Sequence, residues 1–262
     1  MKKLITSSLL ASVVTVTSGA ASAQEYVSIR YPDGRPDVVG IDKTNEILHT
    51  IGVHISTVDI PVAAIPLLKK SETEPLNDAD KKTLISQFSM TREQLLDQIK
   101  LAGREPSVPD GGVMSRDVDG EIYPNINDMK SADAEARKFI LDKYGRLHVN
   151  SSEDGVAIDE VMTVLSGGPF RWGFTLKDGT VIRFQVNTIN IHDKAVRVSY
   201  SGMGMHAGII DASNGLMLAY AHGPKEFVMR YKGDVPYANL LGTNPWIDYT
   251  GTMPKVLDSV KQ

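Results

Sequence analysis

Histidine and carboxylate side chains carry the main chemical potential of this chain, because the sequence has no cysteine. Its six histidines are His49, His54, His148, His192, His206 and His222. Two imidazoles and one carboxylate can hold Fe(II), Mn(II) or Ni(II) on one face and leave positions open for a ligand. The second half of the chain contains both kinds of side chain, but sequence separation alone does not show whether they converge.

Several classes of active site are excluded by the sequence. Without cysteine there is no disulfide, thiolate zinc site, iron–sulfur cluster or cysteine nucleophile. The chain also lacks the Gly-x-Ser-x-Gly elbow of serine hydrolases, the phosphate-binding Walker loop and the His-Glu-x-x-His motif of zinc proteases. We therefore assign no catalytic residue and no organic cofactor, and leave open whether the protein is an enzyme.

Two segments of the second half share a pattern with a known family. His148-Val149-Asn150 is followed by Glu160, and Glu160 is followed by six residues and then Gly167. A second segment runs from Gly202 to His206. In these segments the chain resembles the cupin superfamily, most nearly the acireductone-dioxygenase-like cupins, whose first motif has two histidines flanking one residue and then a glutamate and a glycine.

The resemblance implies a β-barrel with a metal site at its mouth. On that basis His148, Glu160 and His206 would hold a divalent Fe(II), Mn(II) or Ni(II) ion, and oxygenase or isomerase chemistry would be expected. The chain departs from the family at Asn150, which replaces the second histidine. The separation of Asn150 from Glu160 is also longer than in the family.

A copper site is another possibility at the segment from Gly202 to His206. Met203 and Met205 precede His206, and thioether and imidazole ligands suit Cu(I). The alternative is that these methionines pack in the core. Trp172 could likewise line a ligand cavity or fill the barrel interior.

The elements that would position these residues are mostly strands. From about residue 147 onward the apolar residues recur at every second position, as in Phe170, Trp172 and Phe174. Lys177-Asp178-Gly179 is a hairpin turn between two such runs. This pattern predicts an antiparallel β-barrel or sandwich, cupin-like, over residues 131–262.

Residues 24–130 are predicted to form a mixed segment with two helices, so the fold class is α+β. Asn77 can cap a helix over residues 78–88, and Thr91 with Gln94 forms a capping box for the next helix. We expect a strand within residues 47–60 and a long ordered loop over residues 106–127. Residues 131–144 fit either a helix or the opening of a strand.

The first 23 residues fit a signal peptide. Lys2 and Lys3 precede a moderately apolar stretch, and Ala21-Ser22-Ala23 matches the small-x-small pattern of a cleavage site. We therefore expect a periplasmic or secreted protein with no membrane span after cleavage. The net charge of −4 argues against nucleic acid as a partner.

Two functions are consistent with these features. The first is an exported cupin-like protein that binds a small ligand at a divalent metal site. The alternative is a non-catalytic periplasmic binding or interaction protein without metal, whose partner is a small molecule or an envelope protein. The alternative predicts an apolar or aromatic cavity with His148 and Glu160 apart.

Overall fold

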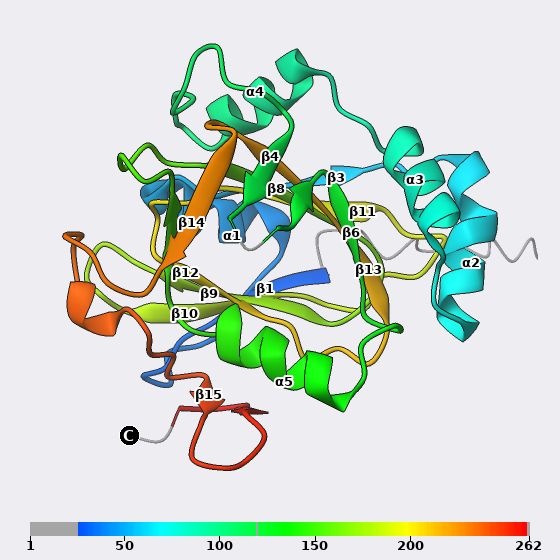
Figure 1. Ribbon diagram of the computed structural model, residues 1–262. Helices are drawn as coiled ribbons and strands as arrows, with labels where there is room; N and C mark the ends of the chain where they lie inside the picture. The colour runs from blue at the N-terminus through cyan, green and yellow to red at the C-terminus, as the bar shows by residue number, and fades with distance from the viewer. Residues whose placement is uncertain (1–25, 119, 261–262) are drawn as a thin grey trace, which may run out of the picture.

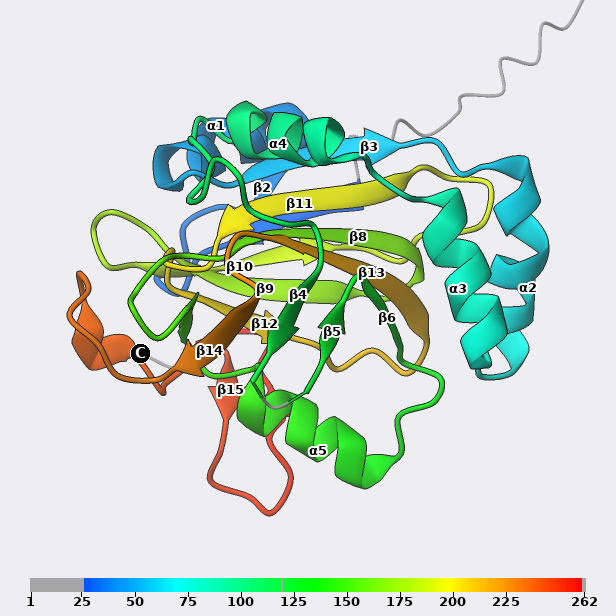
Figure 2. The same cartoon turned by 45° about the horizontal axis from the view of Figure 1, so that its top comes forward.

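Two antiparallel sheets stacked face to face form the centre of the protein (Figures 1 and 2). The structure is a computed structural model that describes residues 26–118 and 120–260. The predicted signal peptide, residues 1–23, lies outside the described residues. No helix in the described part of the chain is long and apolar enough to cross a membrane.

Each of the two main sheets has five strands. The first has the order β12 (His206–Ile209), β9 (Phe170–Thr175), β10 (Val181–Val186), β1 (Val27–Arg30) and β2 (Val38–Val39). The second has the order β3 (His54–Val58), β11 (Ala195–Ser201), β8 (Asp159–Gly167), β13 (Gly215–His222) and β6 (Asn125–Asp128). All neighbouring strands within these two sheets are antiparallel.

A smaller sheet lies at one end of the two main sheets. Its strands are β5 (Ile122–Tyr123), β4 (Ser115–Asp117), β14 (Glu226–Arg230) and β7 (Val149–Ser151). β14 pairs in parallel with β4 and antiparallel with β7. A short ribbon of β15 (Ile247–Asp248) and β16 (Lys255–Val256) lies near the C-terminus (Figure 1). The short sheet brings segments from three parts of the chain to the open end of the sandwich.

Period-two alternation decides which side chains enter the space between the main sheets. In β8, Met162 and Val164 pack into the core shared by both sheets, whereas Val161 and Leu165 pack outward against the helices. Glu160 lies two residues before Met162 and therefore shares its inward side. A carboxylate thus enters the interior at the end of a strand whose neighbouring inward positions are apolar.

In the described part of the chain, five α-helices surround the sheets. They are α1 (Ile41–Leu48), α2 (Ile65–Thr73), α3 (Asp78–Gln87), α4 (Arg92–Leu101) and α5 (Ala134–Lys143). Leu68 of α2, Leu84 of α3 and Leu95 of α4 are fully buried against the outer face of the β8–β13 sheet. In Figure 2, α5 lies apart from this group, below the smaller sheet.

The helices and strands predicted from the sequence are largely confirmed. α3 begins after the Asn77 cap, and the capping box of Thr91 and Gln94 is present at the start of α4. Residues 131–144 contain a helix, α5, which begins after the Asp133 cap. The strands β9, β10, β11, β13 and β14 confirm the alternating pattern, and the α+β class with a β-rich sandwich holds.

Two expectations about the first part of the chain need correction. The predicted strand within residues 47–60 is confined to β3, because α1 extends through Leu48 and a helical turn follows it. The predicted loop over residues 106–127 contains β4, β5 and the start of β6. β4 and β6 form because they pair with the distant strands β14 and β13, and β5 forms a hairpin with β4.

The N-terminal segment also contributes to both main sheets. β1 pairs with β10, and β3 pairs with β11. The mixed segment over residues 24–130 and the β-rich segment after it thus share the same sheets. Both segments are needed to build the space in which the candidate site lies.

Candidate functional site

A pocket opens between the two main sheets at the end covered by the smaller sheet. Its cavity volume is about 70 Å³, several times the roughly 10–15 Å³ that one water molecule requires. His148, Glu160 and His206 all line this pocket, as do Asn150, Tyr200 and Trp172. The three residues predicted as metal ligands therefore meet in one cavity, although they come from three separate segments.

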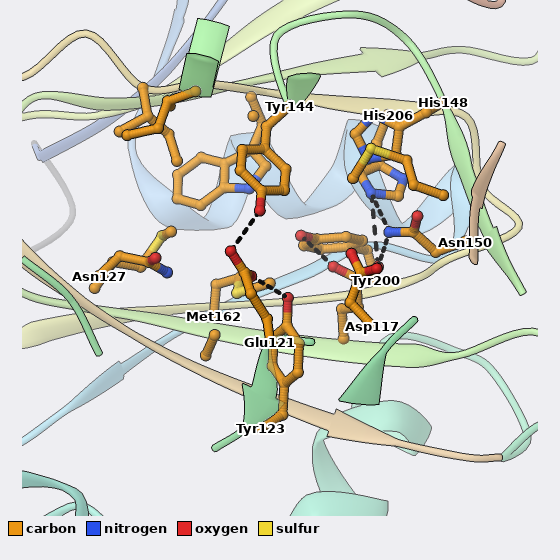
Figure 3. A pocket seen from close by; sticks show the side chains of 18 of the residues that line it. Asp117, Glu121, Tyr123, Asn127, Tyr144, His148, Asn150, Met162, Tyr200 and His206 are labelled. Atoms are coloured by element: carbon orange, nitrogen blue, oxygen red, sulfur yellow. Dashed lines mark hydrogen bonds and ion pairs between the residues drawn. The ribbon is translucent and has the colours of Figure 1, made fainter. Parts of the chain in front are cut away.

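A backbone bridge holds the two histidines together. The amide of His148 donates to the carbonyl of His206 at 2.8 Å, and the reverse bond is 3.1 Å long. The ring centroids lie 4.4 Å apart (Figure 3). Because both residues are only 2% exposed, their rings are fixed by the surrounding sheets.

Each imidazole contacts a backbone carbonyl through Nδ1. The partner of His148 is Arg146, the partner of His206 is Gly204, and both distances are 2.7 Å. A carbonyl oxygen only accepts hydrogen bonds, so Nδ1 carries the proton and Nε2 keeps its lone pair. Metal-binding histidines commonly have this tautomer, fixed by a hydrogen bond on the other nitrogen.

His148 is neutral at ordinary pH. Burial lowers the pKa of His148 well below its usual value, and the neighbouring His206 lowers it further. The hydrogen bond to the Arg146 carbonyl acts in the opposite direction but does not reverse the shift. A neutral imidazole is the form that binds metals.

Glu160 is held by neutral donors. Tyr200 donates its hydroxyl to Oε2 at 3.0 Å, and Asn150 donates its amide to Oε1 at 2.6 Å. Oε1 also lies 3.7 Å from Nε2 of His206. Burial and the nearby Glu160 carboxylate raise the pKa of Tyr200 well above its usual value, so Tyr200 remains a donor.

Asn150 occupies the position of the second histidine of the family motif. It lies two residues after His148, and its amide nitrogen is 3.5 Å from Nε2 of His206 as well as bonded to Glu160 (Figure 3). Its Oδ1 atom is buried and has no hydrogen-bond partner in the described part of the structure. A buried oxygen without a donor is costly, so this acceptor is available to a bound group.

The imidazole, carboxylate and amide groups of the candidate site are of the kinds that bind a divalent ion, but their donor atoms do not surround one common point. Within residues 26–118 and 120–260, no three histidine or carboxylate side chains stand at metal-ligand spacing. Metal bonds of 2.0–2.2 Å at angles of 90–120° would place two donors roughly 3.0–3.6 Å apart. The 3.7 Å between His206 and Glu160 is close to that separation.

A second polar group lies elsewhere in the pocket. Glu121 follows β4, and its carboxylate accepts hydrogen bonds from Tyr144 at 2.6 Å and from Tyr123 at 3.4 Å. Figure 3 shows Glu121 between these two hydroxyls, away from the two histidines. Asp117, which also lines the pocket, lies 3.6 Å from Nζ of Lys143.

Among the other residues considered from the sequence, Trp172 lines the pocket, but Met203, Met205, His49 and His54 do not. Met203 is 37% exposed, and Met205 is buried beside a different, smaller cavity. The methionines that line the pocket are instead Met129, Met162, Met217 and Met229. His49 and His54 contact each other at the surface, with a ring nitrogen distance of 2.7 Å. Met203 and Met205, which were considered as Cu(I) ligands, therefore do not line the pocket.

Glu121, Tyr144 and Tyr200 were not identified from the sequence as site residues. Tyr200 continues the inward alternation of Val196 and Val198 in β11, so its inward position could have been inferred. Glu121 and Tyr144 offered no such signal, because their approach depends on how the β4–β5 hairpin lies against α5.

The fold is similar to that of a known class of protein. No family model matches the chain, and no curated protein sequence matches it. Among solved structures, it is similar to an acireductone dioxygenase from Bacillus anthracis, whose structure has a cadmium ion in its active centre. The two have a TM-score of 0.54 and 14% sequence identity, over 79% of this chain and 99% of the dioxygenase chain. The cupin-like fold predicted from the sequence is thereby confirmed.

Proposed function

We propose that this protein is an exported cupin-like protein that binds a small ligand at a divalent metal ion held by His148, Glu160 and His206. The observation that supports this proposal most directly is that the two histidines have the same tautomer. Both Nδ1 atoms are held by backbone carbonyls at 2.7 Å, which leaves an Nε2 lone pair on each imidazole, and the Nε2 atom of His206 lies 3.7 Å from the Glu160 carboxylate. Two imidazoles and one carboxylate form a recognised ligand set for a metal with open positions.

The surrounding residues would adapt to the ion without rebuilding the fold. Asn150 would turn its amide so that the unpartnered Oδ1 faces the ion as a fourth donor. Tyr200 would continue to donate to Oε2 of Glu160 and so orient that carboxylate. Outer hydrogen bonds of this kind set the direction of a ligand and are part of a metal site.

The nature of the donors favours Fe(II), Mn(II) or Ni(II). The four candidate donors are two nitrogens and two oxygens, and no thiolate is available in the sequence. When bound, such an ion supplies a Lewis-acidic centre with open positions for an oxygen-bearing ligand. The similar dioxygenase has cadmium, also a divalent ion, in its active centre, and this supports the proposal that the ion bound by the present protein is divalent.

Export is proposed from the N-terminal sequence. Lys2 and Lys3, the apolar stretch that follows them and the Ala21-Ser22-Ala23 pattern support a cleavable signal and a periplasmic or secreted location. The mature N-terminus would be Gln24. Mass spectrometry of protein recovered from the periplasm would show this terminus.

Metal analysis of the mature protein tests the metal site. The protein is stripped with a chelator, incubated with Ni(II), Mn(II) or Fe(II), desalted and analysed by elemental mass spectrometry. We expect one ion per chain in the wild type and at least a tenfold lower affinity in His206→Ala and Glu160→Gln. His192→Ala, which removes an exposed histidine, is the matched control.

Two outcomes would overturn this assignment. One is metal content well below one per chain in the wild type, unchanged by His206→Ala. The other is an equal loss in His192→Ala, because that residue is not in the pocket. A structure of the loaded protein would also show whether Asn150 turns toward the ion.

A metal-free binding protein is the second candidate. The observation that favours it is Asn150, whose amide donates to Glu160 where the family motif has a second imidazole. In that case the same pocket would take a small ligand or contact an envelope protein without any ion. Ligand binding that persists in chelator and in His206→Ala would support this second function.

A further inference from the structure

The charged side chains that line the pocket, among the described residues, are all hydrogen-bond acceptors. Three carboxylates line it, those of Asp117, Glu121 and Glu160, and among the described residues no lysine or arginine does. Nε2 of His206 keeps a lone pair, and Oδ1 of Asn150 is a buried acceptor without a partner. A ligand that satisfies this lining must bring donors and positive charge.

Glu121 is the carboxylate best placed to meet such a ligand. Asp117 has Lys143 at 3.6 Å, and Glu160 faces His206 and the proposed ion. The bonds that Glu121 accepts come from two tyrosine hydroxyls, which are neutral. No lysine or arginine within residues 26–118 and 120–260 forms an ion pair with Glu121. The position for a counter-charge at this carboxylate is therefore open.

The surfaces around Glu121 suit an organic cation. The rings of Tyr123 and Phe227 pack together with centroids 5.7 Å apart, and Tyr144 and Trp172 also line the pocket. Aromatic faces attract ammonium groups, most strongly where water is excluded. Burial and the adjacent Glu121 raise the pKa of both Tyr123 and Tyr144, so these hydroxyls stay protonated and neutral.

We infer that the pocket selects a small ligand with an ammonium group, which Glu121 binds beside Tyr123 and Tyr144, and that it rejects anions of the same size. The inference rests on the proposed function only in placing the ligand in the same pocket. With an ion at His148, Glu160 and His206, an oxygen donor at the other end of the ligand would complete the arrangement. A small amino alcohol or amino acid has this chemistry.

The cavity sets the size of the probes. A volume of about 70 Å³ is several times the roughly 10–15 Å³ needed for one water, so compact probes are appropriate. Three of them have the same four-carbon chain and differ in charge: n-butylamine is a cation, n-butanol is neutral and butyrate is an anion. Their affinities are compared by ligand-detected NMR titration at pH 7.5.

The titrations use metal-free protein in chelator, so that the result does not depend on the proposed ion. We expect n-butylamine to bind at least tenfold more tightly than butyrate, with n-butanol between them. Glu121→Gln keeps the shape of the side chain and removes its charge, and it should abolish this preference. Glu135→Gln removes the same charge from an exposed position on α5 and should retain it.

Several results would overturn the inference. These are equal binding of the three probes, stronger binding of butyrate, absence of binding by all three, or a preference that survives Glu121→Gln. Urea unfolding of each variant separates loss of fold from loss of selectivity. If the protein fails to bind metal but prefers n-butylamine, only the proposed metal centre is refuted. If it binds metal but shows no preference for n-butylamine, only the ammonium site is refuted.

Discussion

His148 and His206 are hydrogen-bonded to each other in both backbone directions, although 57 residues lie between them in the chain. This pairing places β12 beside the start of β7 and brings both imidazoles to one wall of the pocket. Because the rings are oriented by Nδ1 bonds to Arg146 and Gly204, both lone pairs are fixed before any ligand arrives. The two histidines of the candidate site are thus pre-organised.

Restoring the second histidine should strengthen metal binding. Asn150→His would place an imidazole beside Nε2 of His206 and Oε1 of Glu160, where the Asn150 amide now lies at 3.5 Å and 2.6 Å. A nitrogen ligand with a lone pair is a stronger donor to Ni(II) than an amide oxygen. We expect at least a tenfold gain in Ni(II) affinity by calorimetry.

Asn127→His is the matched control for this gain, because Asn127 also lines the pocket but is drawn away from the two histidines in Figure 3. A similar gain in both variants would show that any added histidine raises the Ni(II) affinity, and that Asn150→His does not complete a particular ligand set. An Asn150→His protein with wild-type affinity would contradict the proposed ligand set.

Removing the Tyr200 hydroxyl should destabilise the fold. In Tyr200→Phe, Oε2 of the buried Glu160 loses its 3.0 Å hydrogen bond, and hydrogen bonds to charged groups contribute about 1.5–3 kcal/mol. We expect a loss of that order in the free energy of unfolding, measured by urea denaturation.

The exposed Tyr237, which also donates one hydrogen bond, provides the comparison. Tyr237→Phe should cost less than about 1 kcal/mol, because water can replace a lost partner at the surface. If the two substitutions had equal effects, the Glu160 carboxylate would not depend on Tyr200.

A methyl group at Gly202 should disturb the candidate site. A Cβ at Gly202 would lie 2.5 Å from the carbonyl oxygen of Asn150 and 2.7 Å from Cγ2 of Ile158. Neither neighbour can withdraw easily, because the Gly202 backbone also bonds both residues, at 2.7 Å to the Asn150 amide and 2.6 Å to the Ile158 carbonyl. Overpacking of this kind typically costs 1–3 kcal/mol.

We therefore expect Gly202→Ala to unfold at lower urea concentration and to bind Ni(II) less tightly, since the strand that carries Asn150 must move. Gly233→Ala is the control, because nothing lies within 4 Å of its Cβ position. Wild-type stability and affinity in Gly202→Ala would show that this close approach is not required.

Acid should destabilise the protein through His222. Burial lowers the pKa of His222, Arg92 lowers it further, and Asp159 opposes the shift. The unfolded chain, in which histidine has a pKa of about 6.5, therefore binds the proton first. The stability contributed by neutral His222 is present above that pH and is lost as pH falls toward the lower pKa of the folded state.

Urea unfolding between pH 7.5 and 5.5 measures this effect. The free energy of unfolding of the wild type should fall with decreasing pH more steeply than that of His222→Leu, which cannot titrate at this position. His148, whose pKa is also lowered, remains in both proteins and contributes equally to both slopes. Identical slopes would contradict the assignment to His222.

The sequence carried enough information to predict most of the β-rich half. Alternation in Phe170, Trp172 and Phe174 set which side of β9 faces inward, because side chains in a strand alternate between two faces. The capping residues Asn77 and Thr91 marked two helix starts, because their side chains satisfy amides that are local in sequence.

The first part of the chain was less predictable. β4 and β6 are short strands whose partners β14 and β13 lie about a hundred residues away, and β5 pairs only with β4 in the described sheet. Local propensity does not indicate such strands, because their hydrogen bonds depend on long-range contacts. The region was accordingly expected to be a loop, and the approach of Glu121 to Tyr144 could not be foreseen.

By itself, the sequence determined the types of donor available, the absence of thiolate and the inward side of regularly alternating strands such as β9. Only the tertiary structure brought His148, Glu160 and His206 into one pocket, excluded Met203 and Met205 from it, and added Glu121 and Tyr200. The physical reason is that residue type and alternation are local properties. The convergence of side chains depends on how the two sheets pair and stack.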